Sequence, residues 1–78
     1  NNAKVYPNPS ESKINIDFDS FHSNIAVSVY DVYGKLVLED ELYNNDRITI
    51  NHNLAHGTYI IQCRDTNSLI VDQVLVVE

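Results

Sequence analysis

Alternation of apolar and polar residues with a period of two is the feature that most constrains the fold of this 78-residue chain. The segment 13–18 reads Lys-Ile-Asn-Ile-Asp-Phe, which places Ile14, Ile16 and Phe18 on one face of an extended chain. The segment 24–30 repeats the pattern, with apolar residues at every second position. Side chains of a β-strand point alternately to opposite faces, so both segments predict strands with one buried and one solvated face.

Short apolar segments separated by turn residues continue along the rest of the chain. They predict further strands at residues 4–6, 35–42, 47–51, 58–64 and 69–77. The turn Asp31-Val32-Tyr33-Gly34 predicts a hairpin, because Gly34 can take a positive φ without a steric clash. Asn44-Asn45-Asp46 predicts a second turn, and Asn53 to Gly57 a corner. About seven strands at this spacing indicate a β-sandwich or a β-barrel.

Length and charge narrow the possible partners. Residues 1–78 are enough for one domain, and 44% hydrophobic residues supply a core. Eleven acidic and five basic residues give a net charge of −6, without a cluster of Lys or Arg, so we expect no nucleic-acid partner and no anionic membrane surface. The longest apolar run is far below the roughly 20 residues of a membrane span, so we expect no membrane insertion. Since the chain begins without Met, we expect a piece of a longer protein.

Residue types that carry catalysis or bind metals are present but scattered. The histidines His22, His52 and His56 fall in polar turns or at strand ends, where surface positions are expected. Three acids, at 39–41, are expected to solvate a strand and to discourage edge pairing rather than to bind a cation. Cys63 lies in an apolar strand pattern and is expected to be buried and unreactive. We therefore predict no catalytic residue, no metal site and no cofactor.

Aromatic residues leave one alternative function open. Tyr30, Tyr33 and Tyr43 could expose rings to a sugar. A sugar-binding face usually has several coplanar aromatic rings, whereas tyrosines in strands commonly pack across to neighbouring strands. An adhesive or carbohydrate-binding β-sandwich module therefore stays as the alternative hypothesis.

Three short motifs follow one another along the chain. Val5-Tyr6-Pro7-Asn8-Pro9 opens it, Val29 to Val37 has the form V-Y-D-x-x-G-K-x-V, and a corner has the form L-x-x-G-x-Y. In this order they resemble the type IX secretion C-terminal sorting domains of Bacteroidetes (type A, of the Por secretion system), over nearly the whole chain. The motif residues are Tyr6, Pro7, Asn8, Pro9, Tyr30, Asp31, Gly34, Lys35, Leu54, Gly57 and Tyr59.

The resemblance implies an immunoglobulin-like β-sandwich that acts as a signal and catalyses nothing. Such domains end an exported protein, pass through the periplasm, are recognised by the outer-membrane translocon, and are removed by a sortase-like peptidase. The cargo is then released or attached to the cell surface. The candidate recognition segment is the last part of the terminal strand, namely Val74, Leu75, Val76, Val77 and Glu78. An exposed edge strand would also allow self-association.

Overall fold

Two long strands organise the protein, and each of them takes part in two sheets. The computed structural model describes residues 3–7, 12–66 and 68–78, apart from the side chains of residues 19–22, 44 and 45. The strands of this part of the chain are β1 Lys4–Tyr6, β2 Lys13–Tyr30, β3 Leu36–Asn51, β4 Gly57–Arg64 and β5 Leu69–Val77. All strand pairs between them are antiparallel.

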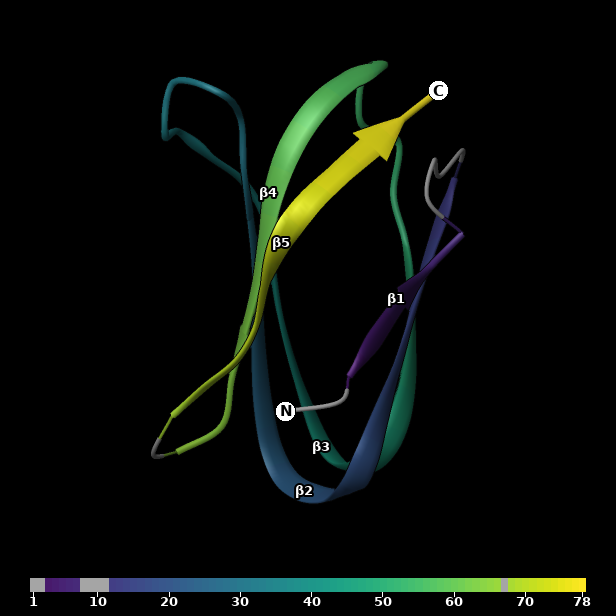
Figure 1. The fold of residues 1–78 in the computed structure, drawn as a ribbon, viewed down its shortest axis with the longest axis vertical. Coiled ribbons are helices and arrows are strands. Elements are labelled where there is room, and N and C mark those ends of the chain that lie inside the picture. The colour runs from purple at the N-terminus through teal and green to yellow at the C-terminus, as the bar shows by residue number, and fades with distance from the viewer. Residues whose placement is uncertain (1–2, 8–11, 67) are drawn as a thin grey trace.

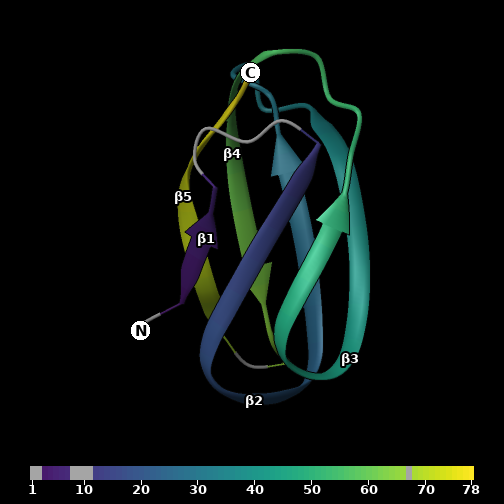
Figure 2. The same ribbon diagram turned by 90° about the vertical axis from the view of Figure 1, so that its right-hand side faces the viewer.

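The sheets face each other as the two layers of a sandwich (Figure 1, Figure 2). In one layer, residues 13–17 of β2 lie between β1 and residues 47–51 of β3. In the other layer, the order is residues 36–43 of β3, residues 24–30 of β2, then β4 and β5. Three strand segments therefore face four. This arrangement confirms the predicted all-β fold, an antiparallel, immunoglobulin-like sandwich of about seven strands.

The passage between the layers differs from the prediction. We expected a turn at 44–46, but β3 runs without a break from Leu36 to Asn51. Likewise, the two segments predicted at 13–18 and 24–30 belong to one strand, β2. The register of β2 against β3 shifts between Asp17 and His22, which is where the pair changes layer. A bulge of this kind bends a strand pair while the ladder continues on both sides, so polar residues here do not end the strand.

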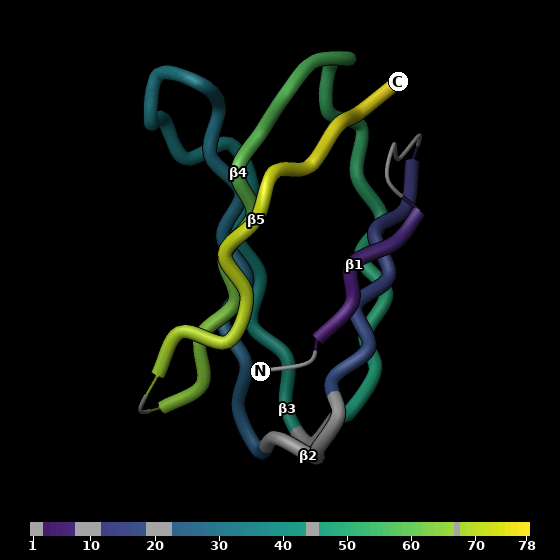
Figure 3. Tube along the Cα trace, viewed as in Figure 1, coloured from purple at the N-terminus to yellow at the C-terminus, as the bar shows by residue number. Residues whose placement is uncertain are grey.

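The hairpin of β2 and β3 lies at the other end of these strands. Ile25 pairs with Leu42 and Val29 with Leu38, and a second register shift precedes the pair of Tyr30 with Leu36. This pairing confirms the predicted hairpin across residues 31–34. Figure 3 shows its loop projecting from the four-stranded layer on the side away from β1.

The core fills the space between the layers with apolar side chains at alternate positions. The inward residues predicted for β2 are buried, as are Ile48 and Ile50 of β3 and Cys63 of β4. The buried apolar residues are Val5, Ile14, Ile16, Phe18, Ile25, Val27, Val29, Ile48, Ile50, Tyr59, Ile61, Cys63, Ile70, Val71, Leu75 and Val77. Each fully buried aliphatic side chain stabilises the fold by about 1.5–3 kcal/mol relative to an exposed one. A core built from every strand explains how a short chain without a disulfide holds two sheets together.

Candidate functional site

The hairpin motif builds a loop that is fixed by its own hydrogen bonds. The carboxylate Oδ1 of Asp31 accepts hydrogen bonds from the backbone N–H groups of Tyr33 and Lys35, both at 2.9 Å. The backbone N–H of Asp31 donates to the carbonyl of Lys35 at 2.9 Å, and that of Gly34 donates to the carbonyl of Asp31 at 3.0 Å. Gly34 has a φ of 85°, a left-handed conformation that side chains with a Cβ rarely adopt. Asp31 and Gly34 therefore hold the loop in shape.

The corner motif ties the segment before β4 to the core. Tyr59 is buried, and its hydroxyl donates a hydrogen bond to the backbone carbonyl of Ala55. This is a tyrosine-corner arrangement, with a buried ring and a hydroxyl that reaches the backbone. Leu54 packs against the core, and Gly57 is the first residue of β4. Leu54 and Tyr59 of this motif thus have structural roles.

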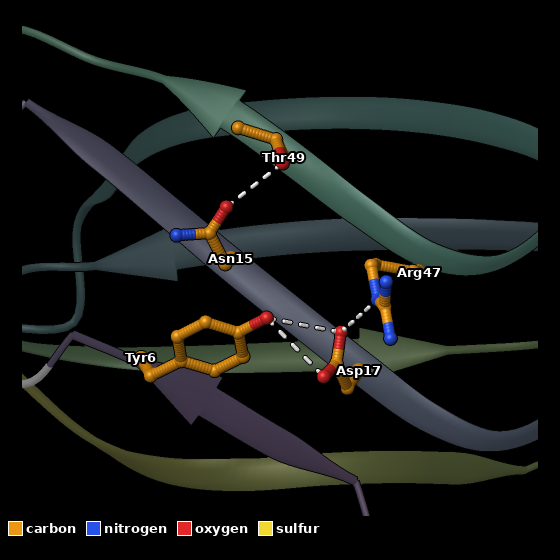
Figure 4. Close-up of polar contacts among 5 residues, drawn as sticks. All are labelled: Tyr6, Asn15, Asp17, Arg47 and Thr49. Atoms are coloured by element: carbon orange, nitrogen blue, oxygen red, sulfur yellow. Dashed lines mark hydrogen bonds and ion pairs between the residues drawn. The ribbon is translucent and has the colours of Figure 1, made fainter.

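Tyr6 of the opening motif lies on the outer face of the three-stranded layer, whereas Val5 is buried in the core (Figure 4). The hydroxyl of Tyr6 is 3.2 Å from each carboxylate oxygen of Asp17, and Nε of Arg47 donates to the same carboxylate at 2.8 Å. This hydrogen bond and the nearby negative charge raise the pKa of Arg47. Across the same two strands, the hydroxyl of Thr49 donates to Asn15. Because Arg47 is largely exposed, solvent screens the ion pair and its contribution to stability is small.

The remaining residues of the opening motif are only partly described. The peptide bond between Tyr6 and Pro7 is cis. Asn8 and Pro9 lie outside the described residues.

The candidate recognition segment forms the end of β5. Leu75 and Val77 are buried in the core, whereas Val74, Val76 and Glu78 are exposed. The strand order places β5 at one end of the four-stranded layer, next to β4. Only the outward half of the predicted segment can therefore meet a partner while the domain stays folded.

Acidic residues mark the opposite end of the same layer, which is the first part of β3. Glu39 and Glu41 pair with Ser28 and Ala26 on the outer face, and Asp40 pairs with buried Val27 on the face toward the core. A charge that points inward from an edge strand hinders the addition of another strand. In β5, by contrast, the exposed residues at 74 and 76 are valines. The two ends of the layer therefore differ in the side chains they expose, and those of β3 hinder the addition of a further strand.

The two histidines whose side chains the structure describes, His52 and His56, lie in different environments. We expected surface positions, but the prediction was wrong for His52, which is 8% exposed. Its ring Nδ1 accepts a hydrogen bond from the backbone N–H of Leu54 at 3.2 Å, and the backbone N–H of His52 donates to the carbonyl of Ser12. The loss of solvent around the ring lowers the pKa of His52. His56 is exposed as expected, and the side chain of His22 lies outside the described part.

The thiol and the possible metal ligands are the other reactive groups of the described residues. Cys63 is fully buried, as predicted, and burial raises the pKa of its thiol to about 12. Such a thiol stays protonated at neutral pH and is a poor nucleophile. Among the described residues, no three His, Cys, Asp or Glu side chains are grouped so that they could hold a metal ion.

The tyrosines of the alternative hypothesis lie apart. Tyr33 is at the hairpin tip and is 92% exposed, while Tyr30 is half-buried on the outer face of β2. Tyr43 pairs with Asn24, six residues before Tyr30 on the same strand. At about 3.3 Å per residue, this separation is roughly 20 Å. These three rings therefore do not form one flat platform.

Residues far apart in the sequence meet at one end of the sandwich. Gly57 of the corner motif pairs with Val77 of β5, and the hairpin loop lies at this same end (Figure 1). Sequence reasoning named Val74 as part of the terminal recognition segment but missed the outward-facing Ile60, which pairs with it. The sequence does contain a sign of such outward-facing apolar residues. Residues 59–61 and 74–77 are apolar at consecutive positions, so these strands carry apolar side chains on both faces.

Comparison with known proteins gives one finding. Residues 4–78 match a family model described as secretion system C-terminal sorting domain. A search of curated proteins found no match. In the described part of the chain, no helix is long and apolar enough to cross a membrane.

Proposed function

We propose a function from one premise: this chain belongs to the family of secretion system C-terminal sorting domains. The domain directs its parent protein across the outer membrane through the type IX secretion system and is removed afterwards by a sortase-like peptidase. The family match carries this proposal, since it covers nearly the whole chain. The parent protein accordingly travels through the periplasm and ends at the cell surface or in the medium.

A signalling rather than catalytic role is supported by the separation of the reactive side chains. Acid–base or nucleophilic catalysis needs a reactive group next to an orienting partner in a cleft. Here Cys63 is enclosed in the core, and His52 bonds to the backbone of its own corner. The motif residues Asp31 and Tyr59 likewise bond to the backbone of the domain itself. These four side chains thus help to keep the signal folded.

The terminal strand is our candidate for the part that the translocon reads. Val74, Val76 and Glu78 are exposed on β5, and β5 ends the order of the four-stranded layer. The exposed side chains at these alternate positions point to one face of β5, where a partner can contact them. The acidic residues of β3 disfavour strand addition at the other end of the layer.

Export of a fluorescent carrier tests the proposed function. The carrier follows a Sec signal and precedes residues 1–78, in a bacterium that has type IX secretion. We expect surface or medium fluorescence in the competent strain and retention in the periplasm of a strain without the translocon. Retention in both strains, with a folded domain, would refute the proposal. A shift of the released carrier to the mass of the carrier alone reports removal.

Substitution is a better probe of the recognition strand than truncation. Removal of residues 75–78 would delete buried Leu75 and Val77 and unfold the domain. The double variant Val74→Lys/Val76→Lys instead changes only exposed side chains. We expect it to fold and to lose export, while the matched variant Thr49→Lys, on the outer face of the other layer, is exported. Normal export of the folded double variant would contradict recognition through β5.

A further inference from the structure

An apolar band crosses the outer face of the four-stranded layer near the hairpin. Val74 of β5 pairs with Ile60 of β4, Ile60 pairs with Tyr30 of β2, and Tyr30 pairs with Leu36 of β3. Directly paired residues share a face of an antiparallel sheet. Val74 is 51% and Leu36 42% exposed, and the two residues between them are half-buried. The apolar band therefore spans all four strands, well beyond β5.

The hairpin loop and the middle of this band border a shallow hollow. The hollow lies between the loop and β4, with Tyr30, Ile60 and Gln62 at its floor and Asp31, Val32 and Gly34 at its side. The loop projects from this layer on the side away from β1 (Figure 3). Since the hydrogen bonds of Asp31 fix the loop, the hollow exists before any partner binds. A preformed apolar hollow favours binding, because little conformational entropy is lost there.

Carboxylates border the band. The next row across the sheet runs from Glu39 through Ser28 and Gln62 to Asp72, so each end of this row carries an acid. Lys35 lies in the hairpin next to the band. The excess of acids over bases in the whole chain agrees with this local pattern. A partner that covers the band would therefore gain from basic groups placed opposite the two ends of the polar row.

We infer that the apolar band docks a protein of the export machinery through an apolar patch that is bordered by Lys or Arg. This inference rests on the proposed function, and it adds a second contact, on β2, β3 and β4, to the one proposed at β5. A protein fits better than a sugar, because the exposed tyrosine rings lie far apart whereas the band is aliphatic for most of its length. Apolar anchors in a preformed hollow, with a charged rim, are the usual composition of a protein–protein interface.

Charge insertion at the floor of the hollow tests the apolar part. Ile60→Lys leaves β5 and its exposed valines unchanged, and its matched control is Thr49→Lys on the other layer. We expect export of the carrier fusion to fall by roughly tenfold or more for Ile60→Lys and to stay near wild type for the control. Far-ultraviolet circular dichroism and thermal melts establish that both variants fold. Should Ile60→Lys unfold, the smaller change Val32→Lys at the exposed side of the hollow takes its place.

Charge reversal tests the basic rim of the partner. The double variant Glu39→Lys/Asp72→Lys reverses both ends of the polar row, and Asp46→Lys reverses one exposed acid elsewhere on β3. We expect several-fold less export for the double variant, partly restored by added salt, and wild-type export for Asp46→Lys. Equal export of the band variants and their controls would overturn the inference.

Two outcomes separate this inference from the proposed function. If wild-type fusion is exported only with the translocon while the folded band variants are exported equally well, the inference fails and the sorting function stands. If the wild-type fusion is not exported at all, the sorting function itself fails. Sedimentation of the purified domain adds a check: a dimer that Ile60→Lys dissociates, with export unchanged, would make a second copy the occupant and overturn the inference.

Discussion

Removal of a single oxygen atom tests the structural role of the corner motif. In Tyr59→Phe the ring stays in its place opposite Leu75, and only the hydrogen bond from the hydroxyl to the carbonyl of Ala55 is lost. Ala55 is exposed, so water can donate a hydrogen bond to its carbonyl in place of the hydroxyl. The free energy of unfolding should therefore fall by the net value of one ordinary hydrogen bond, about 1 kcal/mol. A domain of this size has a free energy of unfolding of roughly 4–12 kcal/mol. The change is therefore a measurable fraction of the total stability.

Urea unfolding followed by circular dichroism gives the result. We expect a lower midpoint at an unchanged m-value, and a melting temperature reduced by about 4–8 °C. Tyr33→Phe is the control, because this side chain is 92% exposed, and we expect it to remain within about 0.5 kcal/mol of the wild type. Equal midpoints for the two variants would refute the tyrosine corner as a stabilising element. A loss above about 3 kcal/mol would also contradict it, since such a value indicates a cavity or a displaced ring.

Four more outcomes follow from the described contacts. Gly34→Ala should lower the free energy of unfolding by about 1–2 kcal/mol, because a residue with a Cβ is strained at a φ of 85° even though no atom lies within 4 Å of that Cβ. An unchanged urea midpoint would contradict this. Burial raises the pKa of the Cys63 thiol from 9.0 to about 12, so above pH 9 the unfolded chain loses this proton while the folded domain keeps it. The free energy of unfolding should therefore fall as pH rises from 9 towards 12, and it should fall less in Cys63→Ala. Parallel curves for both proteins would speak against a buried thiol. The lowered pKa of His52 means that the unfolded chain takes up a proton before the folded domain does, so the free energy of unfolding should fall as pH drops below 6.5. His52→Gln should show a weaker dependence of stability on pH, with His56→Gln as an exposed comparison. A stronger dependence in His52→Gln would contradict burial. Asp40→Val removes an inward charge from the edge strand and should raise the sedimentation coefficient at high concentration; a strictly monomeric variant would argue against a protective role.

Much of the fold was predictable because burial follows the period of two. The inward residues of β2 were identified from alternation alone, and the hairpin from Gly34 with its flanking strands. The burial of Cys63 followed from its position in an apolar strand. These predictions depend on local properties, namely which face a side chain occupies and which residue tolerates a positive φ.

The failures arose where tertiary contacts override local preference. Residues 44–46 have a turn composition, yet β3 stays paired with β2 on both sides of the bend, and this pairing keeps the strand continuous. His52 follows a polar strand end, but its ring is buried and accepts a hydrogen bond from the backbone of Leu54. The apolar band was also missed, because its four residues come from four strands whose register depends on the whole sheet. Sequence spacing alone does not contain that register.

Export dependent on the translocon is the most direct test of the central claim that this domain is a sorting signal. The measurement is the fraction of a fluorescent carrier, fused to residues 1–78, that leaves the periplasm in two otherwise identical strains, with and without the type IX translocon. The account predicts that the carrier leaves only in the strain with the translocon, and that the same carrier without the domain stays inside in both. Equal export from the two strains, or retention in both with a folded domain, would contradict it.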